Sequence, residues 1–166
     1  MSANTDFDNL LAAARNELDD PERNRVLHGE PGIQPRMELF HAGLSMCSNK
    51  VRVVLAEKGV RYLSHEMSIL AQKGIYSKEF TPAENYRPGY VRLRMHVADA
   101  QGLMGNLAQE HTLRTAVETE GFDACVVPIL IDNGKGRGIV DSLEIIKYID
   151  KEITGAIKLI PEDPAL

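Results

Sequence analysis

Hydrophobic positions form their clearest pattern between residues 37 and 69, where they predict a strand, a helix and a second strand. Residues 37–41 are short and partly alternate between apolar and polar side chains, as a strand does. Within residues 47–58 the apolar side chains recur at i, i+3 and i+4, namely Val51, Val54 and Leu55, and Gly59 follows as a stop signal, so we expect a helix there. Residues 60–69 have the pattern of a second strand. Together these segments predict a βαβ unit.

A second ordered stretch begins near residue 124. Residues 124–132 are apolar and rich in β-branched side chains, which predicts a buried strand. Pro128 lies inside this run and cannot donate a hydrogen bond to a neighbouring strand, so the strand must begin there or be interrupted. Asn133-Gly134 predicts a hairpin turn, and residues 137–140 return as a strand. Asp141-Ser142 then begins a helix.

Two stretches have weaker patterns. Residues 1–36 are expected to form a partly disordered extension, with one helical stripe, Phe7, Leu10, Leu11 and Ala14, followed by linker-like sequence from Pro21 to Pro35. Residues 70–120 are the least regular part of the chain. A structureless loop of that length is uncommon in a domain, so we expect short helices near residues 88–95 and 106–118.

Composition limits the class of protein. The chain has 166 residues, suited to one domain, with 19 basic and 24 acidic side chains and a formal net charge of −5. A pI near 5.5 argues against binding to nucleic acid or to an anionic membrane. No apolar run approaches the ~20 residues that span a bilayer, and the polar N-terminus does not resemble a secretory signal. With only two cysteines, we expect reduced thiols and a cytoplasmic location.

Cys47 is the first candidate for chemistry, because it stands where a loop becomes a helix. The unpaired N–H groups at a helix start favour an anion, which here would be a thiolate. A small apolar side chain filling space under the helix is an equally simple interpretation, and both stay open. Cys125 lies inside the apolar run, where a buried and inert thiol is expected.

Two dipeptides also have two interpretations each. Val127-Pro128 is either an ordinary trans proline at a strand start or a cis bond that turns the Val127 backbone outward, toward an extended peptide ligand. Asp141-Ser142 is either a helix cap without further role or a site where the helix start and hydroxyl hold a carboxylate and Asp141 holds an amine.

Other residue groups do not indicate a site. The five histidines show no i, i+4 pair and no CxxC partner, so no metal site is expected. Neither GxxxxGK[ST] nor GxGxxG occurs, and nucleotide binding therefore has no support. Three arginines, Arg87, Arg92 and Arg94, are interpreted as a solvated face, with an anion site as the alternative.

Taken in order, these features resemble the thioredoxin-like N-terminal domain of the glutathione S-transferases over residues 37–163. Within that superfamily the chain is most similar to the zeta-like branch and to glutathione-dependent reductive dehalogenases of chlorinated hydroquinones, the dichlorohydroquinone type in particular. The supporting segments are residues 38–41 (ELFH), 45–52 (SMCSNKVR), 57–60 (EKGV), 90–94 (YVRLR), 120–123 (EGFD) and 126–128 (VVP).

The resemblance implies an α/β fold, thioredoxin-like with βαβ–ββα order and a mixed four-stranded sheet. Residues 37–160 would form the glutathione-binding domain, with an insertion at about 70–120, after the extension of residues 1–36. Residues 161–166 look like the start of an interdomain linker. The second, all-helical domain of the family, which supplies most of the substrate pocket, has no counterpart in this chain.

The resemblance also implies roles for particular residues. The Val127 main chain, with Pro128 cis, would bind the cysteinyl part of glutathione, and Asp141 and Ser142 its γ-glutamyl group. Cys47 would be the catalytic cysteine and Ser45 a neighbouring catalytic hydroxyl. In the implied reaction, glutathione displaces chloride from a small aromatic electrophile. Cys47 then attacks the glutathionyl sulfur, and a second glutathione resolves the mixed disulfide.

Alternatives to this activity remain. The same Ser-x-Cys motif is implied in maleylacetoacetate-type cis–trans isomerases, which need glutathione but consume none. A glutathione-binding fragment without turnover is a third reading, and an interaction protein that does not bind glutathione a fourth. A homodimer through this domain is expected from the family.

Overall fold

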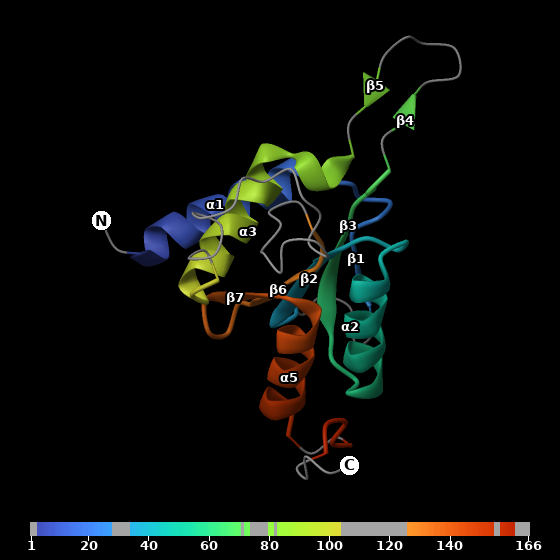
Figure 1. Cartoon of the computed structure of the whole chain (residues 1–166), viewed down its shortest axis with the longest axis vertical. Coiled ribbons are helices and arrows are strands. Elements are labelled where there is room, and N and C mark those ends of the chain that lie inside the picture. Colours follow the sequence, from blue (N-terminus) through green and yellow to red (C-terminus); the bar gives the residue numbers. More distant parts are fainter. Residues whose placement is uncertain are drawn as a thin grey trace.

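The computed structural model describes residues 3–27, 34–70, 72–73, 80–81, 83–103, 126–154 and 157–161. A five-stranded mixed sheet lies at the centre (Figure 1). Across the sheet, the strands follow the order β1 (Arg25–Leu27), β3 (Tyr62–Glu66), β2 (Met37–His41), β6 (Ile129–Asp132) and β7 (Arg137–Val140). Strands β2 and β3 are parallel, whereas every other pair in this sheet is antiparallel. The predicted mixed α/β sheet is therefore confirmed.

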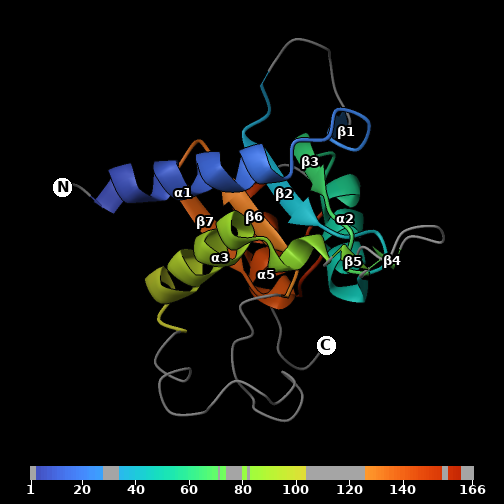
Figure 2. The ribbon, with the colours of Figure 1, turned by 90° about the horizontal axis from the view of Figure 1, so that it is seen from above.

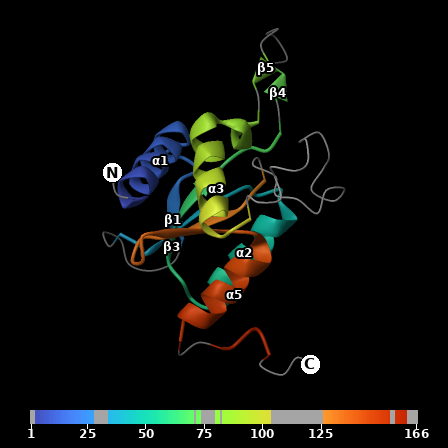
Figure 3. The ribbon, with the colours of Figure 1, turned by 60° about the vertical axis from the view of Figure 1, so that its left-hand side comes forward.

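Helices cover both faces of the sheet. Viewed from above, α1 (Ala3–Glu17) and α3 (Pro88–Ala100) lie side by side on one face (Figure 2). Helices α2 (Met46–Glu57) and α5 (Ser142–Glu152) pair on the other face (Figure 3). A short 3₁₀ helix, η1 (Glu84–Tyr86), leads into α3, and a separate two-stranded sheet is formed by β4 (Gln72–Lys73) and β5 (Phe80–Thr81).

Two hydrophobic cores separate the layers, because successive side chains of a strand point to opposite faces. In β6, Ile129 and Ile131 pack beneath α1 and α3, whereas Leu130 packs beneath α2 and α5. In β2, Phe40 packs beneath α1 and α3, and Leu39 packs beneath α2 and α5. Since both faces are covered, β6 packs apolar side chains on both of them, which explains why residues 129–131 show no alternation.

The predicted elements recur with small shifts in their bounds. Helix α2 begins one residue earlier than expected and ends at the C-cap Lys58, where Gly59 adopts a positive φ of 62°. The helix expected at residues 88–95 continues to Ala100, and the strand expected from residue 124 begins at Ile129, directly after Pro128. The helix expected at residues 106–118 and Cys125 lie outside the described residues.

The N-terminal segment contributes more to the fold than its sequence suggests. The sheet has a fifth strand beyond the four expected, because β1 pairs antiparallel with β3 along its outer edge. With only three residues, β1 is too short to show a periodic pattern. Along α1, the side chains of the stripe face α3 and the sheet, and three of them are nearly inaccessible: Phe7, Leu11 and Ala14. Leu18, directly after the helix, is buried in the same core.

Candidate functional site

Three chain segments meet at one edge of the sheet. The register pairs Phe40, next to the end of β2, with Ile129, the first residue of β6. Ile129 in turn pairs with Val140, the last residue of β7. The loop after β2, the turn before β6 and the turn after β7 consequently share this edge. All six residues that the sequence singled out belong to these segments or to the first turn of the helices that follow them.

Two helices begin at the same edge. Helices α2 and α5 pack side by side and run away from the edge in the same direction (Figure 1). A helix N-terminus carries a partial positive charge and N–H groups without intrahelical partners. Two such termini at one edge favour a ligand that carries negative groups.

Cys47 lies in the first turn of α2 as a free and half-buried cysteine. Ser45 is the N-cap of the helix, and its hydroxyl accepts a hydrogen bond from the Ser48 N–H at 3.2 Å. Ser48 fills the inner side of the turn, where it is fully buried and its hydroxyl accepts from the Ala42 N–H at 3.3 Å. Because Ser48 occupies the space beneath the helix, Cys47 keeps part of its surface exposed.

The peptide bond between Val127 and Pro128 is cis, as one of the two sequence interpretations predicted. Its neighbours are held by α3: the Tyr90 hydroxyl donates to the Val126 carbonyl at 2.6 Å, and the Arg94 guanidinium donates to the Pro128 carbonyl at 3.0 Å. Among the described residues, none bonds to the N–H or C=O of Val127. This main chain can therefore pair with an extended ligand.

Asp141 caps α5, as predicted. Its Oδ1 accepts hydrogen bonds from the N–H groups of Leu143 at 2.8 Å and Glu144 at 3.2 Å. The backbone of Asp141 has a φ of 72°, a conformation in which aspartate is one of the few tolerated side chains. Within the described part of the chain, its Oδ2 and the Ser142 hydroxyl make no hydrogen bond, so both stay available to a ligand.

The sequence interpretation missed a buried group next to this edge, His41 at the end of β2. His41 is 1% exposed, and its Nε2 lies 2.7 Å from the Ser64 hydroxyl. Burial, and then the charges of Arg52, His65 and Arg25, lower the pKa of His41 to about 4. The imidazole is therefore neutral at pH 7.

A second buried polar group, Glu38, lies three residues earlier in β2. Burial alone would raise the pKa of Glu38, but hydrogen bonds from His65, Arg15 and Asn133 outweigh it and lower the pKa to about 2. The distances are 2.9 Å from His65 Nε2, 3.0 Å from Arg15 Nε and 2.7 Å from Asn133 Nδ2. This ionised carboxylate ties α1 to the sheet.

The interpretation of three arginines as a solvated face needs correction. Arg92 is exposed, as expected, but Arg94 is only 5% exposed and binds the Pro128 carbonyl. Arg87 is half-buried and donates to the main-chain oxygen of Glu17 in α1 and to the Glu84 carboxylate. Residues 88–100 form a helix over the sheet, so every third or fourth side chain faces inward, and Arg94 occupies such a position.

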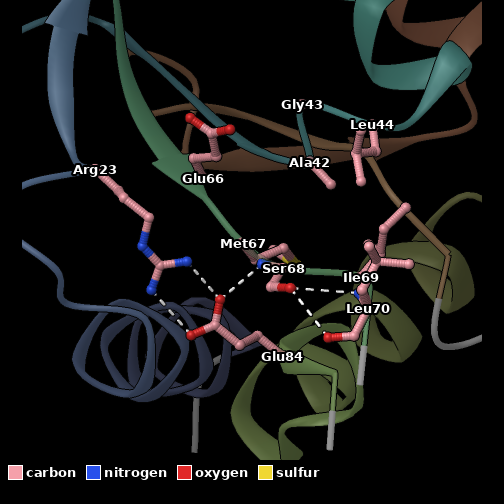
Figure 4. Close-up of a pocket in the computed structure, with 10 residues that line it drawn as sticks. All are labelled: Arg23, Ala42, Gly43, Leu44, Glu66, Met67, Ser68, Ile69, Leu70 and Glu84. Carbon is pink, nitrogen blue, oxygen red and sulfur yellow. Dashed lines mark hydrogen bonds and ion pairs between the residues drawn. The ribbon is translucent and has the colours of Figure 1, made fainter. Parts of the chain in front are cut away.

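A cavity of about 580 Å³ opens beside the loop after β2. Its floor is polar: Arg23 forms a two-fold ion pair with Glu84, which also accepts from the Ser68 N–H at 2.7 Å (Figure 4). The loop contributes Ala42, Gly43 and Leu44, but none of the six residues predicted from the sequence lines the cavity. The cavity therefore adjoins the candidate edge and shares only the loop after β2 with it.

Within the described residues, no group of three or more His, Cys, Asp and Glu side chains could hold a metal ion. None of the described helices is long and apolar enough to cross a membrane.

Two curated proteins are similar to this chain along almost all of its length. They are the 2,5-dichlorohydroquinone reductive dechlorinases of two Sphingobium indicum strains, B90A and UT26. Each is 36% identical over 173 aligned residues, which cover 98% of this chain. The chain spans 46% of the length of these relatives.

One solved structure and one family model also align with parts of this chain. A Tau class glutathione S-transferase from mango, Mangifera indica, aligns with 20% identity and a TM-score of 0.41, covering 78% of this chain and 40% of its own. The family model of the glutathione S-transferase N-terminal domain matches residues 44–152, well over half of the chain. That range contains both helix starts and the cis Val127–Pro128 bond. The chain therefore belongs to the glutathione S-transferase family, as a member built on its thioredoxin-like N-terminal domain.

Proposed function

We propose that this chain is the glutathione-binding part of a glutathione-dependent transferase that reductively dechlorinates chlorinated hydroquinones. One observation carries the proposal: the Cys47 helix start, the cis Val127–Pro128 turn and the Asp141-Ser142 cap occupy one edge of the sheet. The similarity to two 2,5-dichlorohydroquinone reductive dechlorinases supports the substrate class.

Glutathione fits this edge by its chemistry. Its cysteinyl residue has a main chain that can pair with the Val127 N–H and C=O, as strands do. Its γ-glutamyl end carries an ammonium, suited to Asp141 Oδ2, and a carboxylate, suited to the Ser142 hydroxyl and the N-terminus of α5. Bound in this way, glutathione would lie between the two helix starts, with Cys47 at one of them.

The proposed reaction consumes two glutathione molecules per chloride. The first glutathione thiolate attacks the ketone tautomer of the halogenated ring, and chloride leaves with the displaced electron pair. Cys47 then attacks the glutathionyl sulfur, so that the ring carbon takes up the released electron pair and a proton. A second glutathione thiolate attacks the mixed disulfide, which releases oxidised glutathione and restores Cys47. The ring is reduced by two electrons, and two thiols supply them.

Ser45 has a more limited part in this scheme. Its oxygen accepts the Ser48 N–H and so holds the first turn of α2. The hydroxyl hydrogen can still donate toward a sulfur at the helix start, and we propose this as its contribution. The expected homodimer and the cytoplasmic location stay predictions.

The test compares this chain with a Cys47→Ser variant and with Val53→Ala, an exposed residue further along the same helix. With a chlorohydroquinone and glutathione, wild type and Val53→Ala should release chloride and oxidise two glutathione molecules per chloride. Cys47→Ser should release chloride but accumulate the glutathionyl-hydroquinone. Complete dechlorination by Cys47→Ser would contradict the role given to Cys47. Turnover of maleylacetoacetate without glutathione consumption, together with no chloride release from the chlorohydroquinone, would indicate isomerisation instead.

A binding experiment covers the outcome in which this chain alone does not turn over. S-hexylglutathione, an unreactive thioether, should bind to the chain in titration calorimetry, and a Ser142→Ala variant should bind several-fold more weakly because a hydrogen bond to a carboxylate is lost. Absence of binding by the wild-type chain would refute glutathione recognition itself.

A further inference from the structure

Helix α3 holds the backbone of the candidate site from behind. Its Tyr90 hydroxyl donates to the Val126 carbonyl at 2.6 Å, and its Arg94 guanidinium donates to the Pro128 carbonyl at 3.0 Å. The two side chains are one helical turn apart and therefore lie on one face of the helix. They bind the residues directly before and after Val127.

This arrangement fixes Val127 on both sides while leaving its own main chain open. Both flanking carbonyls bond to α3, whereas no described residue bonds to the N–H or C=O of Val127. If either flanking carbonyl were released, the turn could rotate, and the Val127 amide would no longer be held in one direction. Preorganised binding groups cost less free energy to engage than mobile ones.

The same helix also fixes the turn after β7. Gln101, the C-cap of α3, accepts from the Val140 N–H at 2.6 Å and donates to the Val140 carbonyl at 3.3 Å. Because β7 is an edge strand of the sheet, the Gln101 amide takes the place of a neighbouring strand. Val140 directly precedes Asp141, so this pair of bonds determines where the α5 cap begins.

The burial of Tyr90 and Arg94 indicates that they hold the backbone and do not contact a ligand directly. Tyr90 is fully buried and Arg94 is 5% exposed, so neither presents a surface to a ligand at the edge. Burial of a guanidinium costs free energy that only its hydrogen bonds and charge partners recover, whereas an apolar side chain would fill the same space without that cost. Each polar end therefore needs partners, and one partner of each is a carbonyl that flanks Val127.

We propose that Tyr90, Arg94 and Gln101 are positioning residues that set the affinity of the site for glutathione. The inference rests on the function proposed above. Because these residues act on the backbone that binds glutathione and not on Cys47, their loss should weaken binding, or raise KM for glutathione, far more than it lowers kcat at saturating glutathione.

The experiment measures S-hexylglutathione binding to the full chain by calorimetry. Arg94→Met should weaken binding about tenfold or more, the usual effect of losing a hydrogen bond from a charged donor. Arg94→Lys should recover part of that loss, since an ammonium can also donate to the Pro128 carbonyl. Gln101→Ala, a change at a half-buried position, should weaken binding several-fold, whereas Arg92→Met on the exposed face should not.

Two readouts separate positioning from mere stability. Val97→Ala removes core volume from α3 without touching either turn, so it should lower Tm but leave affinity unchanged. In protein labelled with ¹⁵N-valine, the Val127 amide should shift when the thioether binds to wild type and shift less in Arg94→Met.

The outcomes of the two proposals are distinct. No binding by wild type refutes the proposed function. If wild type, Arg94→Met and Gln101→Ala bind with equal affinity, the positioning role alone is refuted. The same holds if Val97→Ala loses as much affinity as Arg94→Met and Gln101→Ala do for an equal decrease in Tm. If Arg94→Met does not fold, Gln101→Ala decides the question through its affinity and through the shift of the Val140 amide, to which Gln101 bonds in wild type.

Discussion

At the scale of single residues, His41 couples the stability of the fold to pH. Its imidazole is buried at the end of β2, against Ser64 and among the charges of Arg52, His65 and Arg25. A histidine whose pKa is lower in the folded state than in the unfolded state binds its proton more readily after unfolding. Protonation therefore favours the unfolded chain, and stability falls as the pH decreases.

A His41→Gln variant should lose this dependence. For wild type, His41 contributes a fall in the free energy of unfolding between pH 6.5 and about 4, at most about 1.4 kcal/mol per pH unit. Glutamine can keep a hydrogen bond to Ser64 but cannot be protonated, so the curve should be flatter in that window. Urea unfolding at several pH values measures the effect.

Glu38→Gln is the matched control, because Glu38 acts in a different window. The pKa of Glu38 is lowered from 4.5 to about 2, so its contribution is present above pH 4.5 and is lost below it. The control should flatten the curve only at that lower pH. If His41→Gln and wild type had the same slope between pH 6.5 and 4.5, the buried neutral His41 would be disproved.

Residue chemistry predicted some positions of the site better than others. Pro128 and Asp141 could be interpreted from their own properties, since a proline restricts a strand start and an aspartate caps a helix. Both features are present. Arg94 could not be interpreted in this way, because its hydrogen-bond acceptor lies 34 residues further along the chain. The role of such a residue depends on its hydrogen-bond partner, and the sequence around the residue does not indicate a partner that lies far along the chain.

At the scale of elements, α1 belongs to the hydrophobic core. Its Leu11 is 4% exposed and packs with side chains of α3 and the sheet, while Arg15 binds Glu38. The weak stripe of residues 7–14 predicted the helix, but nothing in its spacing indicated the surface that it covers. Part of that surface comes from α3, more than 70 positions away, so the extension and the core could not be connected from the sequence.

Truncation of one side chain tests this packing. Leu11→Ala should lower the free energy of unfolding by about 2–5 kcal/mol, the usual loss for a buried leucine. Asn16→Ala, an exposed position on the same helix, should change it by less than about 0.5 kcal/mol. Chemical denaturation of both variants is sufficient. Equal stability of Leu11→Ala and wild type would mean that α1 is detachable from the domain.

At the scale of the whole molecule, apolar side chains surround the edge that carries the site. Leu44 is 71% exposed, Met46 73% and Leu143 55%, and all three stand in the segments that meet there. Large apolar side chains gathered at a site favour contact with an apolar ligand or another part of a protein. The chain spans 46% of the length of the Sphingobium dechlorinases. The remaining portion of those relatives is an example of a protein part that could contact these apolar side chains.

A chimera tests that arrangement. Joining the portion of a Sphingobium dechlorinase that this chain does not cover should leave the affinity for S-hexylglutathione within about threefold, because the edge proposed to bind glutathione is unchanged. The kcat/KM for dichlorohydroquinone should rise at least tenfold, corresponding to about 1.4 kcal/mol of added binding to the transition state. Chloride release gives the rate. A chimera no faster than the chain alone would show that the added portion does not contribute to the substrate site.

The buried pair Lys58 and Asp150 sets the geometry of any such fusion. Lys58 Nζ lies 2.6 Å from Asp150 Oδ1, and the same carboxylate accepts the N–H groups of Leu159 at 2.9 Å and Ile160 at 3.1 Å. The backbone is thereby anchored beyond the end of α5 that lies away from the candidate site (Figure 1). An 11-residue helix is about 16 Å long. A tether counted from Ile160 must reach back over that distance, which takes at least about five extended residues.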